Sequence, residues 1–566
     1  MAPPASLGVA ATITVDGSEL SSDLAPHLDQ VVVDEDVSLP AMFAITFLDP
    51  ARNLLDVGSL SVGSKVEVSV AGQGSDDGDP PLITGEIVTI ECDYDEFGAR
   101  VIARGYAPSH RLQRGRKSKV YSNVTDSDLV KQLVGDAGLE LGEIQETSQV
   151  YDHVFQHSIS DWDFLRLRAS AIGFELTAVD DKINFGPPTN AADAPSDAGD
   201  DDSSDPSDPR ILRYGRNLLA FHGRISGAEQ VARVEVRGWD PVAKTEVVAS
   251  APAGTTAVAL EHNDPASLAA AFGNQAFVSI SDQPTTDGEA NTAAKALADR
   301  IGSRFAKVDG LAIGNAKLRA GAAVRCTGVG QAFSGAYVLS VTRHVIDGFG
   351  YRTHFAIGGR EAGAAPQAAS PAPSPTPSGH RTMHVPGVVR ALVADNADPE
   401  SLGRVKLRFP WLDEDVKSDW APVLQLGAGP KSGTLFLPAV DDEVLVAFEQ
   451  GSVGHPIVVG GTFNGADKPP TYSQWLDNGA VTGRGIYSRK GHFVEFWDGD
   501  DKNMAVLSTS GAEASVAVDA GNQKVVIQSD GAIEITASAE LKVHASKMTL
   551  EADGELVLKG AQIKLN

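Results

Sequence analysis

The chain has 566 residues, 42% of them hydrophobic, and a formal net charge of −28. That length is enough for several domains, and so acidic a balance disfavours nucleic acid and anionic membranes as partners. No apolar run approaches the roughly 18 residues of a membrane-spanning helix, and Met1 to Val15 lack the basic start and apolar core of a secretory signal. We therefore expect a protein that is assembled in the cytoplasm and does not insert stably into a membrane.

The N-terminal part of the chain has the residue pattern of β-strands. Five segments before residue 110 alternate apolar and polar side chains or are rich in β-branched ones. They are Ala11–Val15, Met42–Leu48, Lys65–Val70, Ile83–Cys92 and Ala99–Gly105. A second strand-rich block covers residues 219–360, with its clearest strands at Val231–Trp239, Ala322–Cys326, Ala336–His344 and Tyr351–Ile357. One helix, Asn291–Val308, is predicted within that block because Ala and Leu predominate there.

Between the two β-rich blocks, residues 111–218 carry two predicted helices. The first follows Thr125 as its N-cap and ends near Gly138. The second follows Ser160, has acidic residues in its first turn and ends at Gly173. This region is therefore predicted to be a small α/β segment inserted between the blocks.

Two stretches have the composition of loops or linkers. Residues 186–210 are rich in Asp, Pro and Ser and are predicted to form an acidic disordered loop. The acidic run at 197–208 lacks the ligand spacing and glycine pivot of a calcium loop, so a solvated loop is expected there. Residues 361–382 are rich in Ala and Pro, which predicts a semi-extended linker at a domain boundary.

The phrase QHSISDWDFLRLRASAIGFEL, Gln156 to Leu176, resembles the hub domain of phage-tail baseplates and of the valine-glycine repeat proteins (VgrG) of type VI secretion. In that family an aromatic or Asp-rich phrase leads into a helix that ends at a glycine. The resemblance implies a hub with two β-barrels per chain. Residues 1–110 and 219–360 are the candidates for the barrels, with 111–218 as the α/β insert between them.

Residues 383–465 predict about five short strands, with glycines at the bends, which suits a small closed barrel. The strand Gly403–Pro410 alternates cleanly. Val405, Leu407 and Phe409 lie on one face, and Arg404, Lys406 and Arg408 on the other. Such basic residues could grip a nucleic-acid backbone, but this segment holds 6 Lys/Arg against 11 Asp/Glu. A solvated face, or salt bridges to neighbouring chains, is the better interpretation.

Three phrases of this segment, LGRVKLRFPWLDED, SDWAPVLQLGAGPKSGTLFLPAVDDEVLVAFEQGS and GHPIVVGGTFNG, look like the central-spike OB-fold domain of VgrG and phage baseplate spikes. They occur in the family's order and spacing. The following segment, RGIYSRKGHFVEFWD, resembles the neck that leads from that barrel into the family's β-prism. The resemblance assigns 383–465 to an OB-fold domain, 466–505 to a neck and 506–566 to a spike.

The last 96 residues contain no proline, and after Trp497 they contain no aromatic residue. Within them, pairs of apolar residues separated by one position recur every 7 to 9 residues. They are Val516 and Val518, Val525 and Ile527, Ile533 and Ile535, Leu541 and Val543, Met548 and Leu550, Leu556 and Leu558, and Ile563 and Leu565. Because residues two apart in a strand share a face, each pair predicts a very short strand with one apolar side.

The pattern of the tail fits two architectures. Three copies could intertwine into a narrow prism whose axis excludes rings and whose ladders exclude proline, or a single chain could form a β-meander or solenoid. The resemblance of the preceding barrel and neck favours the first. We therefore predict a mainly β protein with a hub, an OB-fold barrel and a C-terminal intertwined triple-stranded β-helix, with the fourteen paired residues forming the trimer core.

No segment indicates catalysis or a bound cofactor. The chain has no HExxH, CxxC, Walker-type or GxSxG motif, and the segment between barrel and tail is too short for an enzyme domain. His544, the only histidine of the tail, lies next to Val543, and strand alternation points it outward. No catalytic residue, cofactor or metal is therefore expected, and an unrecognised hydrolase remains a weak third possibility.

The resemblance implies the hub and spike of a contractile injection system, phage-tail-like or type VI, which adapts a sixfold tube to a threefold membrane-puncturing needle. We expect a phage-tail-like particle, assembled in the cytoplasm and then kept, released or delivered into a target envelope. The implied partners are two further copies of the chain, the inner tube (Hcp-like) ring, baseplate wedge proteins and a PAAR-type tip protein, with or without an effector. The alternative is a trimeric tail-fibre-like adhesin whose OB barrel binds glycan.

Overall fold

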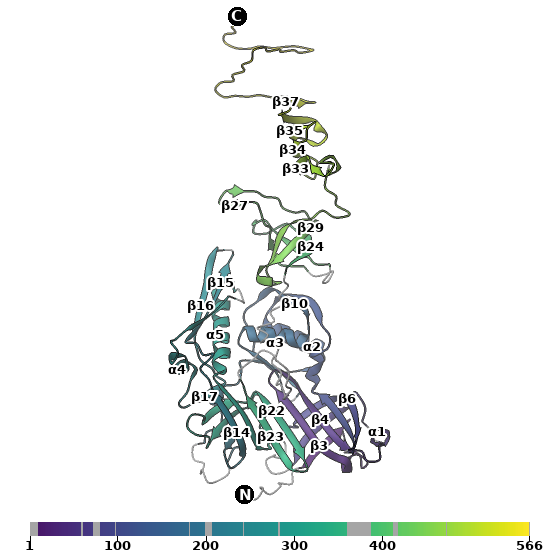
Figure 1. Ribbon diagram of the computed structural model, residues 1–566, viewed down its shortest axis with the longest axis vertical. Helices are drawn as coiled ribbons and strands as arrows, with labels where there is room; N and C mark the ends of the chain where they lie inside the picture. The colour runs from purple at the N-terminus through teal and green to yellow at the C-terminus, as the bar shows by residue number, and fades with distance from the viewer. Residues whose placement is uncertain are drawn as a thin grey trace. The chain divides into compact units, whose positions relative to one another are not determined.

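The computed structural model describes residues 10–57, 60–71, 80–96, 98–179, 181–197, 206–241, 243–280, 284–358, 387–410, 417–470 and 472–564. Contacts divide the chain into two units, Met1–Thr462 and Phe463–Asn566. Strands predominate in both units, as the sequence predicted (Figure 1). No helix in the described ranges is long and apolar enough to cross a membrane.

An eleven-stranded sheet forms the base of the first unit (Figure 1). In sheet order its strands are β14 (Leu218–Ile225), β19 (Ala306–Ile313), β23 (Gly350–Ile357), β22 (Val341–Asp347), β3 (Leu28–Asp36), β4 (Leu39–Leu48), β7 (Gly98–Tyr106), β6 (Ile83–Asp95), β5 (Lys65–Ala71), β1 (Ala10–Val15) and β2 (Ser18–Glu19). The short helix α1 (Leu54–Val57) follows β4 in the chain. The two predicted β-rich blocks are thus parts of one continuous sheet.

The two blocks meet where β3 pairs with β22. The antiparallel register runs from Asp36 opposite Val341 to Gln30 opposite Asp347. The sequence did not predict β3, because its consecutive buried valines, Val31–Val33, break the alternation that marks the other strands. It also merged two strands into one segment, since Ala336–His344 divides into β21 (Gly335–Val338) and β22.

The hub has two hydrophobic cores, of which the first is built mainly from the first block together with Ile346 and Tyr351 of the second block. The first core contains Phe43, Ile45 and Phe47 of β4. The second lies under a four-stranded sheet, whose order is β13 (Ile211–Arg213), β20 (Ala323–Thr327), β21 and β17 (Val258–Leu260). Tyr337 and Phe355 are buried within that second core. Two barrel-like bodies therefore share a wall.

The α/β insert packs two helices between small sheets. Helix α2 (Asp126–Asp136) starts at Thr125, whose side chain and that of Asp128 form a capping box, and α3 (Asp161–Ala171) starts at Ser160. Both predicted N-caps are confirmed. The strands are β8 (Lys117–Val124) paired with β10 (Tyr151–Ile159), and β11 (Glu175–Val179), β12 (Lys182–Gly186) and β9 (Glu140–Ile144) in sheet order.

A third small sheet carries the remaining long helix. Helix α5 (Asp287–Ser303) covers β16 (Thr245–Pro252) and β15 (Arg233–Asp240), which pairs with β18 (Ala276–Ser279), and α4 (Pro265–Ala270) precedes β18. The prediction of a helix over Asn291–Val308 was wrong at both ends. The helix begins at Asp287, four residues before Asn291, where Thr286 caps it by accepting from the amide of Glu289, and β19 has already begun by Ala306.

The predicted loop and linker regions fall partly or wholly outside the described residues. Of the acidic stretch 186–210, the described flanks are packed rather than disordered. Ala191 is buried, and the Asp197 carboxylate pairs with Arg213 at 2.6 Å. Residues 198–205 lie outside the described ranges, as does the whole predicted linker 361–382.

The OB-like domain is a five-stranded sheet with its own core. Its order is β26 (Ala421–Pro422), β25 (Arg404–Arg408), β24 (Val388–Asp395), β29 (Glu443–Phe448) and β30 (Pro456–Gly461), and a hairpin of β27 (Ala428–Gly429) and β28 (Ser432–Gly433) leaves it between β26 and β29. Val405, Leu407 and Phe409 are buried, as predicted.

The second unit is an antiparallel meander followed by extended chain. After the short pair β31 (Leu476–Asp477) and β32 (Ala480–Val481), its strands are β33 (Gly483–Tyr487), β34 (Phe493–Asp498), β35 (Asn503–Ser508), β36 (Ala514–Asp519) and β37 (Lys524–Ser529). In the single chain no strand occurs in the described residues after Ser529. The first two predicted apolar pairs therefore lie in strands, whereas the later pairs lie in chain without a strand partner.

Candidate functional site

The apolar pairs of the C-terminal tail form the most distinctive surface of the second unit. Val516 of β36 lies opposite Ile527 of β37, and Val518 lies opposite Val525. Residues opposite each other in an antiparallel pair share a face of the sheet. The spacing of the first two pairs thus brings four aliphatic side chains together on one side of the meander.

This face is uncovered in the single chain. Every described member of the predicted set, from Val516 to Ile563, has between 39 and 68% of its surface exposed, and Leu565 lies outside the described residues. The aliphatic residues of the OB-like core are less than 10% exposed. The tail thus places its apolar residues regularly, and the described residues leave them largely exposed.

The neck before the tail contains aromatic side chains that pack against one another within the single chain. Glu495 of β34 accepts hydrogen bonds from the hydroxyl of Tyr487 and from the indole Nε1 of Trp497, the latter at 2.7 Å. The Tyr487 ring lies 5.9 Å from that of Trp475 and 5.5 Å from that of Phe493. Aromatic side chains therefore fill the neck within one chain, and the ring-free surface begins after it.

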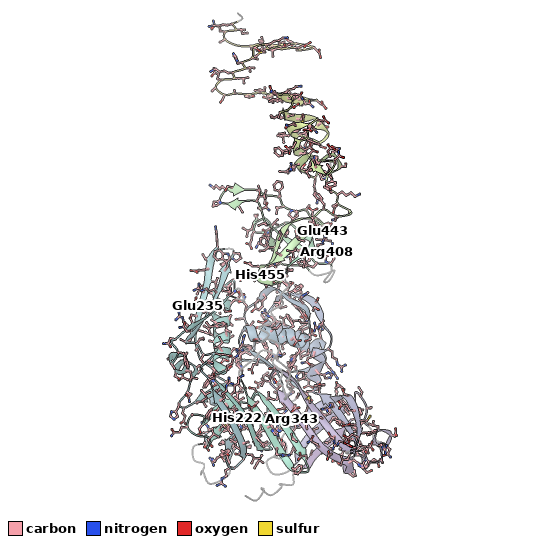
Figure 2. The ribbon with its side chains drawn as sticks, in the orientation of Figure 1. His222, Glu235, Arg343, Arg408, Glu443 and His455 are labelled. Carbon is pink, nitrogen blue, oxygen red and sulfur yellow. The ribbon has the colours of Figure 1, made fainter. Side chains whose placement is uncertain are left out.

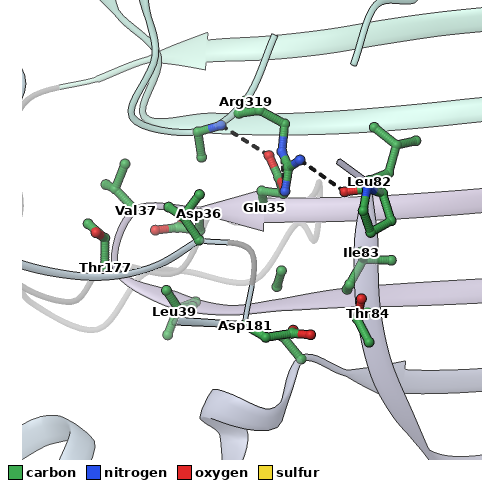
Figure 3. Close-up of a pocket in the computed structure, with 16 residues that line it drawn as sticks. Glu35, Asp36, Val37, Leu39, Leu82, Ile83, Thr84, Thr177, Asp181 and Arg319 are labelled. Carbon is green, nitrogen blue, oxygen red and sulfur yellow. Dashed lines mark hydrogen bonds and ion pairs between the residues drawn. The ribbon is translucent and has the colours of Figure 1, made fainter. Parts of the chain in front are cut away.

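Sequence reasoning missed a charged junction between the two barrels. Figure 3 shows Glu35, at the end of β3, facing Arg319 from the β19–β20 connection, beside a cavity of about 50 Å³. Arg319 Nε lies 2.5 Å from Glu35 Oε1, and Glu35 Oε2 accepts from the Ala320 amide at 3.1 Å and from Thr342 Oγ1 at 3.0 Å. The side chains come from positions 284 apart, and no local sequence signal connects them.

His344 lies close to this junction and is fully buried. The Tyr351 hydroxyl hydrogen-bonds its Nδ1 at 2.8 Å, and Thr353 Oγ1 lies 3.2 Å from the same atom. Burial, with a smaller contribution from the positive charge of Arg319, lowers the pKa of His344 to about 3. The ring is therefore neutral over the physiological range and acts as a packing and hydrogen-bonding residue.

The basic side chains of β25 are engaged within their own chain. Arg404 pairs with Asp398 at 2.8 Å, Lys406 lies over the Trp420 ring and Arg408 is 3.8 Å from Asp441. The three basic side chains are also partly exposed, which agrees with the predicted solvated face, and salt bridges to neighbouring chains stay a prediction. Nothing in this arrangement forms a continuous track for a nucleic-acid backbone.

No metal-binding cluster of three or more His, Cys, Asp or Glu side chains occurs in the described ranges. His492 Nδ1 accepts from the Ser510 amide at 3.1 Å, and His354 lies on an exposed position of β23. Cys92 is exposed and Cys326 is buried. The prediction of no metal, cofactor or catalytic residue stays a prediction, because bound groups form no part of the structure.

Two β-rich bodies that share one sheet, an OB-like domain and an uncovered apolar tail together match the architecture of the VgrG and phage-baseplate class of hub–spike proteins. The family described as "Alg8 N-terminal domain" matches residues 6–348, which is more than half of the chain, and the chain belongs to it. The family described as "Type VI secretion system/phage-baseplate injector OB domain" matches residues 389–463. The family resemblance stated from the sequence is confirmed.

Curated relatives resemble only a short part of this chain. The type VI secretion system spike protein VgrG2a of Pseudomonas aeruginosa is 34% identical over 109 residues, which are 18% of this chain and 12% of that protein. The spike protein VgrG3 of Vibrio cholerae serotype O1 is 35% identical over 75 residues, 12% of this chain and 7% of that protein. The chain thus matches no more than about an eighth of the length of either relative.

A solved structure extends the similarity of fold over most of the chain. The VgrG complex with PdpA from Francisella superposes with a TM-score of 0.52 at 10% sequence identity, covering 93% of this chain and 80% of that one. At such low identity the comparison concerns fold alone.

Proposed function

We propose that this chain is the central hub and spike of a contractile injection system and that it acts as a homotrimer. In this role the hub joins a sixfold tube, and the C-terminal tail forms the threefold needle that enters a target envelope. The proposal extends what the named relatives do to a chain that matches only part of their length.

The uncovered apolar face of residues 516–563 carries the proposal. Burying a fully exposed Val, Leu or Ile side chain contributes roughly 1.5 to 3 kcal/mol, and this surface offers such side chains in regular pairs along its whole length. A partner with the same repeat would cover it continuously, and another copy of the tail has that repeat. Three intertwined copies leave no strand edge without a neighbour.

The shared-wall hub supports the symmetry part of the proposal. Each chain contains two β-rich bodies joined along β3 and β22, so three chains present six of them. Six similar bodies around one axis match a sixfold ring better than three would. The expected partners are therefore the inner tube ring above, baseplate wedge proteins around the hub and a PAAR-type tip protein beyond the tail.

We further propose that the chain has no catalytic activity of its own. The support is indirect, since it comes from the absence of catalytic motifs in the sequence and from the spike proteins among its relatives. Assembly in the cytoplasm, followed by retention, release or delivery into a target envelope, remains part of this proposal.

Native mass measurement of the full chain tests the proposal. The expected mass is three times 59.2 kDa, in a form that resists dissociation on dilution. A second assay mixes the purified protein with an inner tube protein from the same genome and follows co-sedimentation. A species of 59.2 kDa would overturn the trimer, whereas a trimer that binds glycan and no tube component would support the adhesin instead.

A further inference from the structure

The OB-like domain carries an ordered apolar arm that its own barrel leaves uncovered. The arm, residues 424–437, includes the β27–β28 hairpin, and Figure 1 shows β27 standing away from β24 and β29. Leu426 is 94% exposed, and three further large side chains of the arm are more than half exposed: Leu424, Leu435 and Phe436. Lys431 is the arm's only charged residue.

Hydrogen bonds hold the arm in this conformation. The Leu426 amide donates to Thr434 Oγ1 at 3.1 Å, the Thr434 amide to the Gly427 carbonyl at 3.0 Å, and the Phe436 amide to Gln425 Oε1 at 3.0 Å. A side chain on Gly433 would place its Cβ 2.2 Å from that carbonyl, so glycine is required for the close approach. The arm is thus preorganised while its apolar side chains face water.

The same domain has a second uncovered apolar surface. Every residue from Val444 to Phe448 in β29 is apolar, a pattern typical of a strand buried on both faces. Val444, Val446 and Phe448 point into the barrel core. On the opposite face, Ala447 lies between Val388 and Ile457, and Leu445 lies beside Arg390.

We call this second surface the β29 outer face: Val388, Leu445, Ala447 and Ile457. Val388 is exposed and the other three are half-buried. Beside this face, Arg390 forms an ion pair with Glu443 at 2.7 Å. Figure 2 labels Glu443 on the sheet of the OB-like domain. Val388 is 54% exposed in the single chain.

We propose that the arm of one chain packs on the β29 outer face of a second copy of this chain. Each OB-like domain then supplies one arm and receives one. The two surfaces differ, so the contact is head-to-tail, and such contacts form a closed ring when the rotation closes. This inference rests on the proposed trimer and adds to it a ring of three barrels locked by their arms.

Charge favours another copy as the occupant of both surfaces. Chains of net charge −28 repel one another wherever their acidic surfaces approach. The arm has one charged residue, and the four residues of the β29 outer face have none, the nearest charges being the mutually paired Arg390 and Glu443. Two copies can therefore meet here without bringing unpaired like charges together. The contact also joins apolar surfaces that are uncovered on each copy.

Thiol cross-linking in the full chain tests the contact. The variant pair Leu426→Cys and Val388→Cys, in a Cys92→Ser background, is treated with a short flexible bismaleimide and separated by denaturing electrophoresis. Val388 is chosen rather than Ile457 because the Leu424 amide donates to the Val458 carbonyl at 2.9 Å, which brings Leu426 near Ile457 within one chain. The expected product is a covalent trimer, whereas each single-cysteine variant stays a monomer. The matched control combines Leu426→Cys with Lys406→Cys, which lies on β25 outside the β29 outer face. It is expected to give no cross-linked dimer or trimer.

The outcomes separate this inference from the proposed function. A native trimer whose 426–388 pair cross-links no better than the control overturns the arm contact and leaves the spike proposal standing. A native mass of one chain overturns both. Cross-linked dimers without trimers contradict the closed ring.

A second measurement does not depend on the cross-linker's reach. The double substitution Leu426→Asp and Phe436→Asp is expected to lower the melting temperature of the OB-like domain within the purified trimer, and Lys431→Asp at the tip of the arm is expected to leave it unchanged. If the double variant melts like the unsubstituted protein, the arm has no partner in the trimer, and a different protein must be its occupant.

Discussion

The guanidinium of Arg319 lies 2.5 Å from the carboxylate of Glu35, and this contact joins the second barrel to the first. Glu35 is 7% exposed and also accepts hydrogen bonds from a backbone amide and a threonine hydroxyl. A buried carboxylate is tolerated only when it is paired and hydrogen-bonded. The junction of the barrels therefore depends on keeping both members of the pair.

Removing Arg319 is expected to destabilise the hub strongly. The substitution Arg319→Met leaves Glu35 buried without its cation, and breaking such a pair typically costs about 3 to 5 kcal/mol. Urea denaturation followed by circular dichroism measures the change. The matched control is Arg104→Met, whose ion pair with Glu91 is exposed and is expected to contribute less than about 1 kcal/mol. Equal effects of the two substitutions would contradict the role given to Arg319.

Hub stability is expected to fall as the pH drops below about 6.5, and His344 contributes to that fall. Its pKa is about 3 in the folded chain and close to 6.5 when unfolded, so between these values only the unfolded state binds the proton. Stability is therefore complete above about 6.5 and declines as the pH approaches 3. Tyr351 and Arg319 are ionisable groups beside the ring, and Glu35 lies next to both of them.

The variant His344→Gln isolates this contribution, because the carboxylates of the chain also titrate at low pH. Melting temperatures measured from pH 7 to pH 4 should fall less steeply for the variant than for the unsubstituted protein. The matched control is His222→Gln, since His222 is an exposed residue of β14, and its profile should follow that of the unsubstituted protein. Parallel curves for His344→Gln would show that His344 does not sense pH.

The neck is expected to be intolerant of a single methyl group at Gly483. A Cβ there would lie 2.1 Å from the Trp475 ring, whereas a Cβ at Gly465 would meet nothing within 4 Å. Gly483→Ala should therefore displace Trp475 and change the tryptophan fluorescence and melting of the neck, and Gly465→Ala should change neither. An unaltered emission spectrum in Gly483→Ala would mean that the indole is not packed against this glycine.

Adjacent positions of the tail should respond oppositely to a charge. Val543 belongs to the apolar set that is predicted to face the trimer axis. His544 is the next residue, so strand alternation predicts that its side chain points away from the axis. Val543→Asp is expected to lower the heat stability of the trimer or prevent its assembly, because the carboxylate would be buried on the axis. His544→Asp is expected to keep native mass and melting behaviour. If His544→Asp were the destabilising change and Val543→Asp the tolerated one, the predicted inner face of the tail would be wrong.

Local features of the fold could be predicted from the sequence, and long-range ones could not. Thr125 and Ser160 begin helices because their side chains satisfy amides three residues on, which a short stretch of sequence shows. The pairing of β3 with β22 joins segments about 300 residues apart, and no periodicity reveals which strand edges meet. The Glu35–Arg319 contact depends on that pairing and was missed with it.

The apolar tail surface was likewise predictable in its local spacing but not in its long-range partners. The two-residue spacing of Val516 and Val518, or Val525 and Ile527, follows from strand geometry and appears as a ladder between β36 and β37. The later pairs have no strand partner in one chain, so their predicted place in a trimer core remains a prediction. The OB arm gave no periodic signal, and only its exposure in the folded domain distinguishes it.

The β3–β22 seam also determines when the hub can finish folding during synthesis. Val341 follows its partner Asp36 by 305 residues, so a ribosome adding roughly 5 to 20 residues per second delivers β22 about 15 to 60 s after β3. During that interval the N-terminal barrel has an open strand edge beside Val31–Val33. Nascent chains on neighbouring ribosomes are therefore at risk of joining through that edge, and a chaperone that shields it should raise the yield of correctly assembled protein.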